Sequence, residues 1–178
     1  MRKYTAFLIF FVLILAAFAP AQMDKSKRLS PPAQAQCKFA DGKSITVDYS
    51  SPRVKGRKIF GGLVAYDQVW RTGANEATTF VTNTDVNVGG KVVPAGSYTL
   101  FTLPSENKWA LIISKTTGEW GTQYSGESND FLRTDMAVSK TSAPVENFTI
   151  SFEEKGGSCT LNLDWENTRA SISIAEKK

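Results

Sequence analysis

Residues 37–49 have the sequence CKFADGKSITVDY, and this stretch decides the fold class. Apolar Cys37 and Phe39 alternate with polar neighbours, and the alternation resumes over 45–49 after an Asp-Gly pair. A period of two is typical of a strand with one buried face, and Asp-Gly is a preferred hairpin turn. The stretch therefore predicts a β-hairpin at the start of the folded domain.

The same period of two continues along the chain. Further strands are predicted between turn residues at 78–82, 84–88, 98–103, 109–114, 132–138, 148–152, 159–165 and 172–174. Nine or ten short strands favour an all-β, two-layer antiparallel β-sandwich, of which a jelly roll is one form. A short helix is predicted only at 63–70, where Leu63, Tyr66 and Trp70 have helical spacing.

The N-terminus has the pattern of a signal peptide. Basic Arg2 and Lys3 precede an apolar run over 6–18, and small residues follow at 19–21. The run is shorter than the roughly 20 residues that span a bilayer, and no later segment is long and apolar enough to be a transmembrane helix. We expect cleavage near Ala21, residues 1–21 as signal peptide, and a periplasmic or secreted protein.

The mature chain fits one domain. We predict a polar lead-in segment at 22–34, as a strap or a disordered tail, and a single β-sandwich domain at 35–178. Loss of Arg2 and Lys3 from the 21 basic residues leaves 19 against 17 acidic ones, so the formal net charge falls from +4 to +2. This balance argues against nucleic acid as a partner.

Only two cysteines occur, Cys37 and Cys159. In an oxidising compartment, an even pair in a chain without histidine favours a disulfide over a metal site or a nucleophile. Two buried free thiols are the alternative.

The absence of histidine excludes Ser-His-Asp triads, Cys-His pairs and metal sites built on imidazole. No cofactor or metal ligand set is predicted. The sequence favours a non-catalytic protein, with an enzyme as the alternative. The remaining scheme is a glycosidase with two carboxylates. Candidate pairs are Asp67 with Glu76, Glu119 with Glu127, and Asp164 with Glu166. Solvated surface carboxylates are the simpler interpretation of all three pairs.

The segment from residue 52 to residue 80 is long for a connection between strands, which favours a role in contacts. It begins with a basic cluster, Arg53, Lys55, Arg57 and Lys58. If this cluster is extended, its spacing puts three cations on one face, where they could hold an anionic glycan, a phosphate or a lipid headgroup. A solvated strand edge that prevents aggregation is the alternative.

Aromatic and polar residues of probable loops suggest a ligand site. The predicted ligand-binding residues are Trp70, Arg71, Asn75, Glu76, Trp120 and Tyr124. An exposed tryptophan stacks on a sugar ring, while Arg, Asn and Glu side chains hydrogen-bond to its hydroxyls. In the alternative, Arg71 and Glu76 form an internal pair, Asn75 caps a turn and Trp70 plugs the end of the sandwich. Trp109 and Trp165 fall in strands and are predicted core residues.

Three strings resemble a known family: SPRVKGRKIFGGLV at 51–64, VWRTGANEATTF at 69–80 and PAGSYTLFTLP at 94–104. They are similar to exported bacterial proteins, common in Bacteroidetes-type organisms, that share domain of unknown function 2911. The resemblance runs from about Ser30 to Ile174. It implies an exported, single-domain bacterial protein and carries over no activity and no site residue.

Three functions are therefore open. The first is a secreted or envelope binding module for a polar ligand such as a carbohydrate. The second is a structural or interaction protein of the cell envelope, and the third is a glycan hydrolase that uses paired carboxylates.

Overall fold

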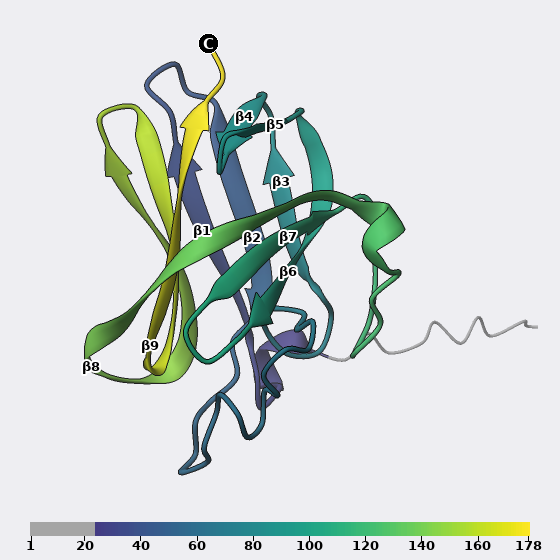
Figure 1. Ribbon diagram of the computed structural model, residues 1–178, viewed down its shortest axis with the longest axis vertical. Coiled ribbons are helices and arrows are strands. Elements are labelled where there is room, and N and C mark those ends of the chain that lie inside the picture. The colour runs from purple at the N-terminus through teal and green to yellow at the C-terminus, as the bar shows by residue number, and fades with distance from the viewer. Residues whose placement is uncertain (1–23) are drawn as a thin grey trace, which may run out of the picture.

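The computed structural model describes residues 24–178. Over this range the chain forms one antiparallel sheet of nine strands in the order β1-β2-β3-β6-β7-β8-β9-β4-β5, and the sheet is not closed (Figure 1). The strands are β1 (Pro32–Lys38), β2 (Ser44–Ser50), β3 (Thr78–Thr82), β4 (Val86–Val88), β5 (Lys91–Val93), β6 (Gly96–Pro104), β7 (Trp109–Ser114), β8 (Asp130–Lys155) and β9 (Ser158–Glu176). Two single-turn 3-10 helices, η1 (Lys25–Lys27) and η2 (Glu127–Asn129), complete the elements.

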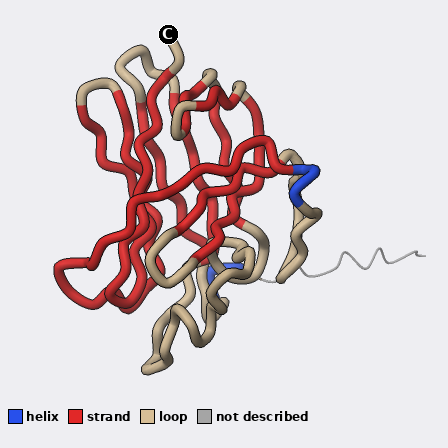
Figure 2. Tube along the Cα trace, viewed as in Figure 1, coloured by secondary structure: helices blue, strands red, loops and turns tan. Residues whose placement is uncertain are grey.

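The predicted all-β class and antiparallel pairing are confirmed, but two separate layers are not. Segments predicted as two strands, at 132–138 and 148–152, are one strand, β8, and β9 likewise merges two predictions. The register of β8 against β9 shifts between Lys140 and Val145 and again before Thr149. Figure 2 shows β8 crossing the molecule and turning back at this bend. The first residues of β8, up to Met136, therefore pair with β7, and the hairpin of β8 and β9 carries the sheet onward to β4 and β5.

The predicted helix at 63–70 is wrong. This segment consists of turns, and its backbone pairs with β6: the N–H of Trp70 donates to the Thr102 carbonyl at 2.8 Å, and Asp67 does the same to Pro104. Gly61 and Gly62 precede the segment, and Asp67 has a φ of 59°. A left-handed residue stops a helix, so tertiary pairing with β6 prevails over the local spacing.

The interior is one hydrophobic cluster built from alternate strand residues, as the period of two predicts. Both predicted core tryptophans, Trp109 and Trp165, are buried. On the opposite side of β6 and β7, Phe101 and Ile112 are also buried. The ring of Tyr124 lies 5.3 Å from the ring of Phe101 on this second side, so the segment between β7 and β8 covers part of this face of the sheet.

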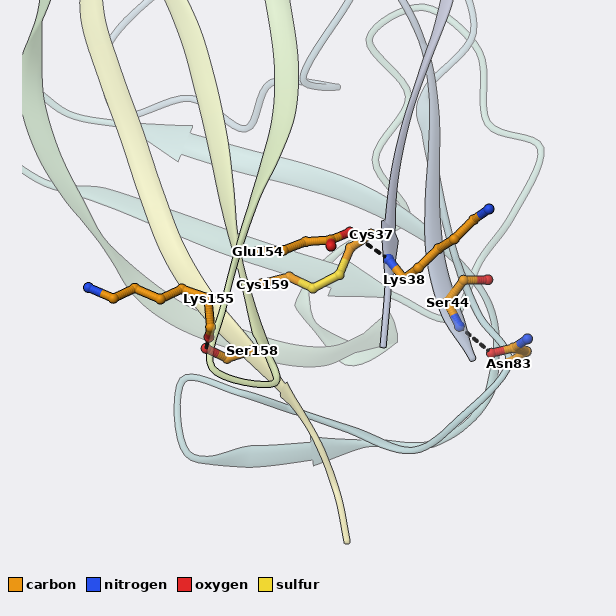
Figure 3. Close-up of a disulfide and its surroundings, with 8 residues drawn as sticks. All are labelled: Cys37, Lys38, Ser44, Asn83, Glu154, Lys155, Ser158 and Cys159. Carbon is orange, nitrogen blue, oxygen red and sulfur yellow. Dashed lines mark hydrogen bonds between the residues drawn. A yellow bond between two sulfur atoms is a disulfide. The ribbon is translucent and has the colours of Figure 1, made fainter. Parts of the chain in front are cut away.

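A disulfide joins Cys37 of β1 to Cys159 of β9, with the Cα atoms 6.3 Å apart, which confirms the predicted bridge (Figure 3). Both cysteines are buried. Beside them the backbone N–H of Lys38 donates to the Glu154 carboxylate at 3.0 Å. The bridge therefore holds the first strand against the hairpin of β8 and β9.

The predicted boundary of the lead-in differs from the structure, because β1 begins at Pro32 and takes in the last residues of 22–34. Residues 24–31 lie along the body, and the N–H of Ser51 donates to the Pro31 carbonyl at 2.9 Å. The predicted signal peptide lies outside the described residues. Within residues 24–178, no helix is long and apolar enough to cross a membrane.

Candidate ligand-binding site

Three segments meet at one end of the sheet: residues 24–31, 51–77 and 115–129, which we call the loop end. Most of 51–77 forms the lowest loops of Figure 1. Glu76 and Trp120 form an antiparallel bridge, and the N–H of Gly121 donates to the Asn75 carbonyl at 3.1 Å. The Asn75 side-chain amide donates to the Ser30 carbonyl, also at 3.1 Å. Asn75 thus links all three segments, and its side chain bonds to the lead-in segment instead of capping a turn.

Trp70 is buried, with 8% of its surface exposed, so the prediction of a free ring for sugar stacking is wrong. Its ring stacks on Trp165 at 5.8 Å and takes edge contacts from Phe60 and Phe148. Its Nε1 donates to the Gly73 carbonyl at 3.1 Å. The open end of the sheet needs a large apolar side chain to exclude water, and Trp70 supplies it.

A cavity of about 380 Å³ lies beside Trp70, and we call it the Arg71 cavity. Its apolar wall includes Val64, Val69, Trp70 and Trp165. Its polar side chains include Gln68, Thr122, Arg57 and Arg71, and none of the described residues that line it carries a carboxylate. A smaller cavity of about 50 Å³ shares Val69, Trp70, Arg71 and Thr122 with it. Arg71 therefore lies at the junction of the two spaces.

The guanidinium of Arg71 is incompletely hydrogen-bonded. Its Nη1 donates to the Gly121 carbonyl at 3.0 Å, whereas its buried Nε has no acceptor among residues 24–178. Burial lowers the pKa of the Arg71 guanidinium from its ordinary value. A buried donor without an acceptor is costly, so the site holds a positive group that the described part of the chain leaves without a counter-charge.

The backbone next to Arg71 is strained. Thr72 has a φ of 54° and is fully buried, although left-handed conformations are rare for β-branched residues. Its carbonyl accepts from the Thr78 hydroxyl at 2.8 Å, and its own hydroxyl lies 3.1 Å from that of Thr102. These contacts hold the strained residue in place, and such strain is concentrated at functional sites.

Glu76 pairs with the lead-in segment rather than with Arg71. Its carboxylate accepts from Arg28 at 2.9 Å and from Lys25 at 3.0 Å, so the predicted internal pair between Arg71 and Glu76 does not form. Burial alone would raise the pKa of Glu76, but its own backbone N–H, Arg28 and Lys25 lower it to about 2. The sequence interpretation missed both cations, because a polar lead-in resembles a free tail.

Trp120 and Tyr124 lie on the segment that covers β6 and β7. Trp120 is 53% exposed, as predicted, and the guanidinium of Arg28 lies 6.0 Å from its ring. The Tyr124 hydroxyl donates to Asp130 at 2.8 Å and accepts from Arg133 at 3.0 Å. Burial and the bond to Asp130 raise the pKa of Tyr124 to about 12. Tyr124 therefore has a structural partner, and it lines only the smaller cavity.

The predicted basic cluster is not extended. A turn at Lys55 and Gly56, with φ values of 48° and 68°, breaks the alternation. Arg53 donates to the carbonyl and hydroxyl of Ser51, and Arg57 donates to the carbonyls of Val54 and Arg53. Of the four cations only Arg57 lines the Arg71 cavity. Lys55 and Lys58 are exposed on the same loop.

Most carboxylates of the hydrolase hypothesis are hydrogen-bonded or paired with other side chains. Asp164 accepts two bonds of 2.7 Å from Arg169, Asp67 accepts from Ser105, and Glu127 pairs with Arg133 at 3.2 Å. Glu119 accepts from Ser125, and its second oxygen is buried without a donor in the described range. Glu119 lines a cavity of about 300 Å³ together with Asp48 and Glu76. Residues 24–178 contain no cluster of three or more His, Cys, Asp or Glu side chains that could hold a metal ion.

Comparison with known families identifies the chain. Residues 30–174 match the family described as "Protein of unknown function (DUF2911)". The chain belongs to this family. No curated protein and no solved structure matches it. The DUF2911 domain thus runs from the end of the lead-in segment to the last residues of β9, and it includes Trp70 and Arg71.

Proposed function

We propose that this protein is an exported, non-catalytic binding module that holds a small polar ligand, such as a carbohydrate, in the Arg71 cavity. The observation that carries the proposal is the cavity itself. Its volume of about 380 Å³ falls within the range of small-molecule sites, and it combines an apolar wall with a few polar groups. Arg71 and Thr72 add an unpaired donor and a strained backbone at the same place.

A periplasmic or secreted location is part of the proposal. The disulfide between Cys37 and Cys159 supports it, because such bonds persist in oxidising compartments. The N-terminal pattern of residues 1–21 is that of a signal peptide. The ligand would then be an extracellular or envelope molecule.

A structural or interaction protein of the cell envelope is the second candidate. Trp70 is packed in the core and Glu76 is paired with the lead-in segment, and a scaffold without a ligand would use both residues in this way. The two candidates differ in what they require of the cavity, because only the binding module needs it open.

A thermal-shift screen against neutral and acidic glycans tests the proposal, since a ligand that binds the folded state raises the melting temperature. Ala65 is exposed and lines the cavity, so Ala65→Trp should block it. Ala143→Trp, at an exposed position on the bend of β8 away from the cavity, is the matched control. We expect a hit to stabilise the wild type and the control but not Ala65→Trp. Absence of any hit, or a shift that persists in Ala65→Trp, would contradict the binding module.

A further inference from the structure

Arg71 differs from the other arginines that are partly removed from water. A guanidinium has five N–H donors, and a buried charge is normally paired with an opposite charge. Three arginines follow this rule with carboxylates within 3.2 Å: Arg28 with Glu76, Arg133 with Asp130 and Glu127, and Arg169 with Asp164. Arg53 is also partly buried and has no carboxylate partner, but it donates to the carbonyl and hydroxyl of Ser51. In the described part of the chain, Arg71 is the arginine with a buried nitrogen that lacks any acceptor.

The rest of the cavity wall does not compensate this charge. Arg57 adds a second guanidinium, which its bonds to the carbonyls of Arg53 and Val54 hold in place. No carboxylate among residues 24–178 lines the space. Two cations with an apolar wall and no acid attract anions, and they disfavour a cationic ligand.

The unoccupied edge of Arg71 fits a particular anion. With Nη1 bonded to Gly121, neither Nε nor Nη2 donates to a described residue, and the Nε atom is enclosed by protein atoms. A planar guanidinium with a free Nη2 favours an oxyanion such as a carboxylate as its partner. Trp70, Trp165 and Val69 supply an apolar wall for the body of the ligand.

We propose that the ligand of the Arg71 cavity is a small organic carboxylate, bound through Arg71, of which an acidic sugar is the example closest to the proposed function. This inference rests on that function and narrows its ligand class. The carboxylate would supply the counter-charge that the described residues lack.

Isothermal titration with charge-matched probe pairs tests the inference. Digalacturonate is compared with its methyl ester, and benzoate with benzamide, so that one pair is a sugar and the other is not. We expect at least one acid to bind about tenfold or more tightly than its uncharged partner, with the preference weakened by added salt. Arg71→Gln should abolish the preference, and Arg71→Lys, which keeps the charge but not the fork, should retain part of it.

Lys58→Gln is the control for loss of one charge from the same loop, and it should keep the full preference. Thermal unfolding of each variant shows whether it is folded. Equal binding of acid and uncharged partner, or a preference that survives Arg71→Gln, would overturn the inference. The binding module would still be supported if a ligand raises the melting temperature of the wild type but not of Ala65→Trp. Failure of all four probes to bind the wild type would overturn the inference. The binding module is overturned by a different result, a glycan screen without any hit or a thermal shift that persists in Ala65→Trp.

Discussion

The strands of the sheet with their hairpin turns, which we call the body, and the loop end use their polar groups differently. In the body, Arg169 is held by Asp164 and Glu153, and Lys43 by Asp41 and Glu176. At the loop end, Arg71 has a buried nitrogen without an acceptor beside a cavity. Of the five non-glycine residues with positive φ among residues 24–178, four also lie there: Lys55, Asp67, Thr72 and Asn75. This difference supports the proposal that the loop end, rather than the body, binds a ligand.

The largest expected effect concerns the body. Replacing both cysteines, Cys37→Ala with Cys159→Ala, removes a crosslink between residues 122 apart and should cost up to about 5 kcal/mol of unfolding free energy. Urea denaturation measures the loss, and reduced wild-type protein should lose a similar amount. The selectivity of the Arg71 cavity should be unchanged in the variant that remains folded. A loss far below 1 kcal/mol would show that the bridge does not stabilise the body.

Two tryptophan substitutions compare a buried ring with an exposed ring within the loop end. Trp70→Ala removes a buried ring from the aromatic cluster and should cost about 3–5 kcal/mol. Trp120→Ala removes a ring that is 53% exposed and should change stability by about 0.5 kcal/mol or less. Thermal and urea unfolding of both variants provide the comparison. Equal losses would contradict the assignment of Trp70 to the core and Trp120 to the surface.

A smaller effect is expected for Glu76 and depends on pH. Its pKa in the folded protein, about 2, is below the ordinary value of 4.5, so protonation favours the unfolded state. The stabilisation by Glu76 is complete above pH 4.5 and is lost as the pH falls towards 2. Because the side chain is 36% exposed, we expect less than about 1 kcal/mol.

The difference in stability between wild type and Glu76→Gln, followed by thermal unfolding from neutral to acidic pH, measures this effect. It should shrink as the pH falls through that window. Glu106→Gln, at an exposed turn, is the control and should show no such trend. A difference that is constant with pH would mean that the ion pairs with Arg28 and Lys25 do not stabilise the fold.

Strand pairing could be predicted from sequence wherever the pattern is local. The hairpin of β1 and β2 follows from Asp41-Gly42 and the alternation on either side. The merging of two predicted strands into β8 could not be predicted, because the polar residues at 139–147 resemble a loop. They remain in a strand since β9 pairs with them through two shifts of register.

The predicted 52–80 segment supplies much of the lining of the Arg71 cavity, but the surroundings of several predicted residues differ from the prediction. Length and composition pointed to the 52–80 segment, yet sequence alone does not show which tryptophan fills the end of a sheet. Trp70 is buried and Trp120 is exposed because only the former lies against Trp165. The partner of Glu76 could have been sought among the cations at Lys25 and Arg28, since a loop carboxylate next to a basic lead-in favours pairing.

The central claim is that Arg71 is kept for a ligand and not for the fold. Comparing the unfolding free energies of Arg71→Met and Arg169→Met tests it most directly. Arg169→Met leaves the buried Asp164 carboxylate unpaired and should cost at least about 2 kcal/mol. Arg71→Met removes a poorly paired buried charge, so the free energy of unfolding should either rise or fall by no more than about 0.5 kcal/mol. A loss for Arg71→Met as large as that for Arg169→Met would contradict the claim.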